Sequence, residues 1–126
     1  MDNNYLVIDN EIVPVYETDK GEKVVDGREL HNALESKQDF STWVKKRLSE
    51  CDAAENTDYE LLHNFVEQVS GTKHRIDYII KLDTAKEMAM LERNEIGKKV
   101  RKHFIEIENR CKNQVIDRTQ LSPQTQ

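Results

Sequence analysis

The stretch RIDYIIKLDTAKEMAML, residues 75–91, changes its hydrophobic period midway and decides the fold class. Its first half alternates as in a half-buried strand, with apolar residues on one face and polar residues on the other: Ile76, Tyr78, Ile80 and Leu82 against Asp77 and Lys81. Its second half starts with Thr84 and Glu87 in the spacing of a capping box, which predicts a short helix over residues 85–93. Apolar residues surround most of that helix, so we expect it to be buried on several sides.

A second strand is predicted just before this one, over residues 59–67. Between the two lies SGTKH, residues 70–74, where Gly71 can adopt the positive φ angle that a tight turn requires. The two strands and this turn predict a β-hairpin with residues 70–74 at its tip.

Upstream, residues 5–8, 12–16 and 24–25 are short β-type pieces separated by turn residues, which predict two or three short strands. Pro14 within the second piece predicts a strand that is at an edge or bulged. Asp26 and Glu29 then predict the start of a helix to about residue 35. A second helix follows Asp39 or Ser41, and its apolar stripe predicts that Trp43 is buried. Together the two helices form an αα-hairpin that is compatible with a helix-turn-helix.

The last predicted helix begins after Asn94 and ends near residue 112, with an apolar stripe along one side. The predicted fold class is therefore α+β: short N-terminal strands, an αα-hairpin, a β-hairpin, then two C-terminal helices. We expect residues 1–113 to form one domain. Residues 114–126 are polar and are expected to be a tail, or a linker to a further C-terminal region.

The net charge of −5 is unevenly distributed: residues 1–60 sum to −8 and residues 61–126 to +3. Since affinity for nucleic acid depends on the cations that a protein presents, a chain of this charge is a poor non-specific DNA binder. The N-terminus has no signal-peptide pattern and no apolar run is long enough to span a bilayer, so we expect a cytoplasmic protein without a membrane contact.

Nothing in the sequence favours catalysis. The four histidines are scattered, no nucleophile motif or phosphate-binding glycine loop is present, and Cys51 and Cys111 lack the spacing of metal ligands. We expect a protein that is not an enzyme and that uses neither a metal ion nor a cofactor.

Four quoted stretches carry a resemblance to a known family: VDGRELH (25–31), FSTWVKKR (40–47), DYIIKLDTAKEMAM (77–90) and ERNEIGKKVRKHFI (92–105). In register over about residues 23–110, the chain resembles the AntA/AntB antirepressor family of phages and prophages. The resemblance implies a protein–protein regulator in the bacterial host cell that binds a phage repressor and relieves repression of lytic genes. The family is regarded as kin to the Bro-N and KilA-N domains, so the alternative is a sequence-specific DNA-binding module. Self-association into a homo-oligomer is a third reading.

Partner recognition is expected at two basic features of the C-terminal half. They are the hairpin tip with Lys73, His74 and Arg75, and a face of the last helix with Lys98, Arg101, Lys102 and Ile105. At 100° per residue, Ile105 points away from the apolar stripe and lies among cations. For the DNA-binding alternative the candidate residues are Lys37, Lys45, Lys46, Arg47, Lys73 and Arg75. Each feature also has an ordinary explanation: a solvated helix face, a hydrophilic turn, or a single apolar residue at the surface.

Overall fold

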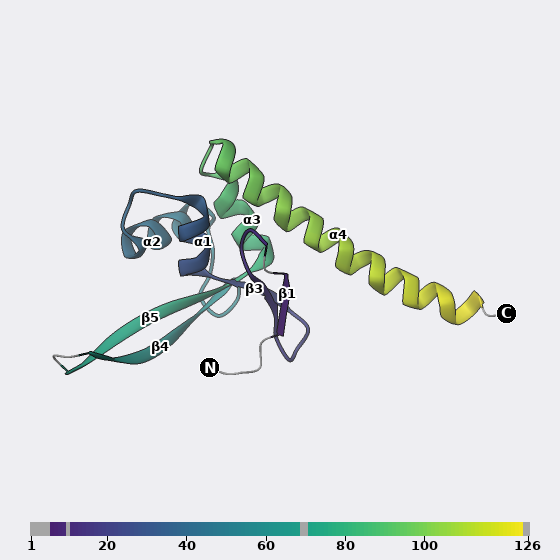
Figure 1. Ribbon diagram of the computed structural model, residues 1–126, viewed down its shortest axis with the longest axis horizontal. Helices are drawn as coiled ribbons and strands as arrows, with labels where there is room; N and C mark the ends of the chain where they lie inside the picture. Colours follow the sequence, from purple (N-terminus) through teal and green to yellow (C-terminus); the bar gives the residue numbers. More distant parts are fainter. Residues whose placement is uncertain (1–5, 10, 69–70, 125–126) are drawn as a thin grey trace.

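The computed structural model describes residues 6–9, 11–68 and 71–124 (Figure 1). It contains one antiparallel sheet with five strands in the order β1-β2-β3-β5-β4, and four helices. The strands are β1 Leu6–Asp9, β2 Val15–Glu17, β3 Lys23–Asp26, β4 Tyr59–Gln68 and β5 Gly71–Lys81. The helices are α1 Gly27–Leu34, α2 Phe40–Glu50, α3 Leu82–Met90 and α4 Glu95–Gln124. The predicted α+β class and the order of its elements are confirmed.

Strand β5 joins the two parts of the sheet, because it pairs with β3 on one edge and with β4 on the other. Its residues Tyr78 and Ile80 lie on the same face as Val25 of β3, and this face packs against the helices to form the core. The predicted alternation of β5 is therefore correct. Figure 1 shows that the far half of the β4–β5 hairpin extends beyond the helices.

The αα-hairpin begins where the capping residues predicted it. Asp26 accepts a hydrogen bond from the Glu29 amide at 3.3 Å, and Asp39 accepts one from the Thr42 amide at 3.0 Å. Trp43 is fully buried, as expected from its place on the α2 stripe. His31 of α1 lies against the Trp43 ring, with 5.0 Å between the ring centroids.

Helix α3 does not begin at the predicted capping box. It starts at Leu82, immediately after β5, and the residue at its N-cap position, Lys81, makes no side-chain capping bond. Thr84 is a buried residue inside the first turn. Burial of Leu82, together with Ala85 and Met88, outweighs the local capping signal.

Helix α4 begins as predicted but ends later. The Asn94 side chain accepts a hydrogen bond from the Gly97 amide at 2.8 Å, which confirms the cap. A Cβ atom at Gly97 would lie 2.7 Å from the Ala89 carbonyl oxygen, so only glycine permits this close approach of α3 and α4. The expected end near residue 112 is wrong: the helix continues to Gln124, since residues 113–122 contain no glycine or proline to interrupt it. Figure 1 shows this part leaving the body of the molecule.

Two local expectations for the strands need correction. Strand β2 lies between β1 and β3 and is not an edge; Pro14 precedes it, and the irregular pairing falls opposite, between Val7 and Asp9 of β1. In the hairpin, β5 starts at Gly71, so Lys73, His74 and Arg75 lie within the strand and not in the turn.

Among the described residues, no helix combines the length and the apolar character needed to cross a membrane.

Candidate functional site

The basic residues of the hairpin lie on strand β5, close to its distal end. The backbones of Lys73, His74 and Arg75 pair with Val66, Phe65 and Asn64 of β4. The side chains of Lys73 and His74 lie outside the described part of the structure. Arg75 is half-exposed, and its guanidinium binds the Asp77 carboxylate at 3.0 Å, so its charge is partly neutralised inside the protein.

On α4, Lys98 and Lys102 are exposed, whereas Arg101 and Ile105 are half-buried. Ile105 does not belong to the core stripe, which is made by Val100, Phe104 and Ile107. The predicted helical phase is therefore correct. This half-buried apolar side chain, one helical turn beyond the exposed Lys102, remains partly accessible to a partner.

The structure does not bring the two basic features together. Figure 1 shows the distal end of the hairpin on one side of the molecule and α4 leaving on the other. Each must be judged as a separate surface.

The candidates for DNA binding on α2 are divided by the fold. Lys37, Lys45 and Lys46 are exposed. Arg47 is not available, because its Nε donates to Glu92 at 2.9 Å and its Nη1 donates to Glu50 at 2.7 Å. These carboxylates raise the pKa of Arg47 although burial acts to lower it. The expectation that Arg47 contacts a DNA backbone is not favoured by this geometry.

Glu92 holds α2 against the junction of α3 and α4. The same oxygen, Oε2, accepts the Arg47 hydrogen bond and one from the Trp43 indole Nε1 at 2.8 Å. The Glu92 side chain is 8% exposed. Charge-assisted hydrogen bonds of this kind are the strong ones in proteins, so the position of α2 is fixed by a polar contact as well as by apolar packing.

A second buried carboxylate, Asp77, organises the sheet face that is turned away from the helices. Its oxygens accept hydrogen bonds from Arg28 Nε at 3.0 Å, Asn64 Nδ2 at 2.6 Å and Arg75 Nη2 at 3.0 Å. Burial alone would raise the pKa of Asp77, but these three partners hold it below the ordinary value. The Arg28 guanidinium also lies 4.4 Å from the centroid of the Phe40 ring.

Asp26 lies on the same outer face, where its carboxylate accepts a hydrogen bond from the Glu29 amide as the cap of α1. Burial, followed by the charges of Glu29 and Asp77, raises its pKa to about 6. Tyr16 donates a hydrogen bond to Glu29 at 2.9 Å, and burial together with Glu29 raises its pKa to about 12. A cavity on this face is lined by Tyr16, Asp26, Glu29, Asp77 and apolar strand residues.

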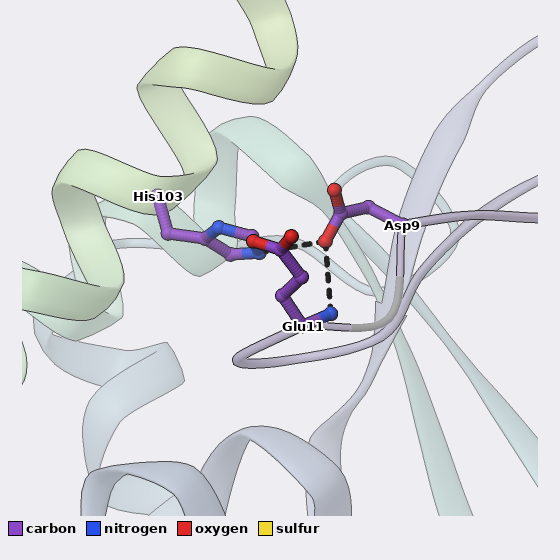
Figure 2. A group of neighbouring side chains, drawn as sticks. All are labelled: Asp9, Glu11 and His103. Carbon is purple, nitrogen blue, oxygen red and sulfur yellow. Dashed lines mark hydrogen bonds and ion pairs between the residues drawn. The ribbon is translucent and has the colours of Figure 1, made fainter.

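Asp9, Glu11 and His103 form a third polar cluster, between the β1–β2 connection and α4 (Figure 2). One donor atom from each lies within 4.8 Å of the others, which is an arrangement able to hold a metal ion. Asp9 also accepts a hydrogen bond from Arg110 at 2.9 Å. Burial acts to raise the pKa of Asp9, but the Glu11 amide, Arg110 and His103 lower it.

None of these three clusters was predicted from the sequence. Their partners are far apart in the chain: Arg28 and Asp77, Trp43 and Glu92, Asp9 and Arg110. The available signal for Asp77 was a charged residue within an alternating strand, on the face expected to be solvated.

The two cysteines are free and half-buried, and burial together with Glu87 raises the pKa of Cys51 to about 11.

Comparison with known proteins places the chain in a family. Neither the curated proteins nor the solved structures contain a match to it. The family model described as AntA/AntB antirepressor matches residues 25–94, which is more than half of the chain. The match runs from β3 through the αα-hairpin, the β-hairpin and α3, and ends at the residue that caps α4. The family is one of regulators, and the chain belongs to the AntA/AntB antirepressors.

Proposed function

We propose that this protein is a phage antirepressor that binds a phage repressor protein and thereby relieves repression of lytic genes. The observation that carries the proposal is the family match over residues 25–94, which covers most of the core. Residues 1–113 are proposed as the antirepressor domain, in the cytoplasm of the bacterial host.

The face of α4 formed by Lys98, Arg101, Lys102 and Ile105 is proposed as the main contact with the repressor. Binding hot spots typically have an apolar group beside a polar rim, and Ile105, one helical turn beyond the exposed Lys102, has such polar neighbours. The positive charge favours an acidic surface on the repressor and accelerates encounter with it.

The hairpin residues Lys73, His74 and Arg75 are proposed as a second contact. The distal hairpin extends beyond the helices, so a partner can approach it without displacing an element of the core. Since it lies far from the α4 face, the two surfaces contact either one extended partner or two subunits of a repressor oligomer.

A gel-shift assay with repressor, operator DNA and this protein tests the proposal. We expect that adding the protein removes or supershifts the repressor–DNA band, while the protein alone leaves the DNA band in place. A shift by the protein alone that weakens steeply with salt would favour direct DNA binding, with Lys37, Lys45 and Lys46 as the candidate contacts.

The variant Ile105→Asp tests the α4 surface. It should weaken repressor binding about thirtyfold, or roughly 2 kcal/mol, while the melting temperature changes little. Met90→Asp is the matched control, because Met90 is an exposed apolar residue on α3 outside the proposed surface. A large fall in melting temperature for Ile105→Asp alone would show a core role. If both variants bind the repressor as the unmodified protein does, the repressor contact lies outside this face of α4.

Charge reversal separates the hairpin from α4. Lys73→Glu should mainly slow association with the repressor and reduce its salt dependence. Arg75→Glu would also break the ion pair with Asp77, so a loss of binding in that variant counts only if the fold is intact.

A further inference from the structure

His103 of α4 has a buried ring nitrogen without a hydrogen bond. Its side chain is 3% exposed, and in the described part of the chain its Nε2 is the buried side-chain atom that lacks such a partner. The Nε2 atom lies 3.2 Å from Asp9 Oδ1, where a protonated imidazole forms an ion pair, but no hydrogen bond joins the two atoms. Buried polar groups are nearly always satisfied, so an exception of this kind calls for a ligand or another explanation.

The surroundings of Nε2 supply further donors. Figure 2 shows the His103 ring, the Asp9 carboxylate and the Glu11 side chain converging on one point between α4 and the β1–β2 connection. Atoms bound to one metal ion at about 2.0–2.2 Å lie roughly 3 Å apart at neighbouring positions of its coordination shell. The distance of 3.2 Å between Nε2 and Asp9 Oδ1 fits such a pair. Glu11 is exposed, so its carboxylate can move the short distance that completes the set.

We propose that Asp9, Glu11 and His103 bind one Zn²⁺ ion. One imidazole nitrogen and two carboxylate oxygens are a ligand set suited to zinc, with water in the remaining position. Mg²⁺ and Ca²⁺ prefer an all-oxygen shell and are disfavoured by the histidine.

The charged residues around the site affect its affinity for zinc. Arg110 binds Asp9 Oδ2 at 2.9 Å, whereas Oδ1, which accepts a hydrogen bond from the Glu11 amide at 3.0 Å, has a second lone pair for the ion. Its side chain is 55% exposed, so it can swing into solvent when a cation binds. The cavity beside His103 has a volume of about 560 Å³, enough for the ion and its water, and three lysines and two further glutamates also line it: Lys98, Lys99, Lys102, Glu95 and Glu106. With three protein ligands and a water, the site should be weaker than a structural zinc centre with four protein ligands.

Zinc would connect the first strands to α4, two parts of the protein that are far apart in sequence. Since an ion that binds the folded state and not the unfolded chain stabilises the fold, zinc should raise the melting temperature. The ion would also hold the turn of α4 that carries the proposed repressor contact, although the zinc proposal does not depend on that contact.

The full chain, stripped with EDTA and dialysed free of it, should be titrated with ZnCl₂ by calorimetry and in thermal melts. We expect saturable binding of one ion and a melting temperature that rises with zinc concentration. Glu11→Gln, at an exposed position that does not risk the fold, should weaken binding about tenfold or more. His103→Gln should abolish it. Arg110→Gln should tighten it, because Asp9 loses a competing cation.

Two controls keep the result specific. Glu60→Gln changes an exposed glutamate and His63→Gln an exposed histidine, both on β4, at the opposite edge of the sheet from β1. Both should bind zinc as the unmodified protein does. The proposal is overturned if no saturable site is found, or if zinc binding survives Glu11→Gln and His103→Gln unchanged. It is also overturned if Arg110→Gln weakens binding in a folded protein, since Arg110 would then belong to a plain ion-pair network.

Discussion

On the helix-covered face of the sheet, Val25, Tyr78 and Ile80 are buried among apolar side chains, whereas their strand neighbours Asp26 and Asp77 place carboxylates on the opposite face. The covered face is stabilised by apolar packing among many residues. The outer face depends on a few specific partners, and its two carboxylates behave in opposite ways. Arg28, Arg75 and Asn64 lower the pKa of Asp77, while burial and neighbouring charge raise that of Asp26. The comparison teaches that one strand pattern can produce a cooperative core on one side and separable polar contacts on the other.

The largest effect is expected on the covered face. Trp43→Ala should lower the free energy of unfolding by about 3–5 kcal/mol, because it removes a fully buried ring and leaves a cavity. Urea denaturation followed by circular dichroism measures the change. Trp43→Phe is the matched control that keeps a ring and loses the hydrogen bond to Glu92, and it should cost less. A loss below about 1 kcal/mol for Trp43→Ala would contradict the view that this face is one cooperative core.

An intermediate effect is expected at Asp77. Asp77→Ala removes the acceptor shared by Arg28, Asn64 and Arg75, and should cost about 1–3 kcal/mol in the same assay. Asp19→Ala, at an exposed turn residue, should have an effect within about 0.5 kcal/mol. If the two variants are equally stable, the hydrogen bonds to Asp77 contribute nothing to the free energy of unfolding. The stability of the sheet then depends on the helix-covered face alone.

The smallest effect is expected at Asp26 and depends on pH. Its pKa is about 6 in the folded protein and about 3.9 in an unfolded chain. Between these values the folded state holds the proton more tightly, so the contribution of Asp26 to stability falls as the pH rises from about 4 to about 6. Asp26→Asn keeps a good helix cap and removes the charge. At pH 7 it should be more stable than the unmodified protein by roughly 1 kcal/mol, after allowance for partial exposure.

Thermal melts of both proteins across pH 4 to 7 (test conditions) isolate this contribution. The difference in stability should shrink on acidification. The lowered pKa of Asp77 acts in the opposite direction, with stability present above its unfolded pKa and lost as the pH falls. Asp77 is present in both proteins, so it affects their difference only through its repulsion with the Asp26 carboxylate. If the difference in stability is constant over this range, the pKa of Asp26 is not raised in the folded protein, and the two carboxylates of the outer face do not differ in this respect.

Sequence patterns predicted what depends on neighbours along the chain. The caps at Asp26, Asp39 and Asn94 and the burial of Trp43 follow from residues within one or two helical turns. The start of α3 was wrong because packing of Leu82 outweighed the cap signal of Thr84. The predicted end of α4 was wrong because the polar, proline-containing composition of residues 114–126 was taken as that of a tail, although residues 113–122 contain no glycine or proline.

The polar contacts were not predictable in this way. Glu92 and Asp9 acquire their roles from partners brought together only by the folded chain. Arg47 is an example of a basic residue whose sequence neighbours do not indicate its role. In sequence it extends the basic run of Lys45 and Lys46, and in the structure it is held by two glutamates.

The position of β5 determines when the protein can fold during its synthesis. The nascent chain can form the β1–β2–β3 segment early, because these strands are close in sequence. The second edge of β3 pairs with Ile79, Ile80 and Lys81, which emerge from the ribosome much later. Until then β3 has an unpaired edge, and Val25 lacks part of its cover. A chain interrupted before β5 therefore exposes a strand edge that can pair with other chains, which favours aggregation.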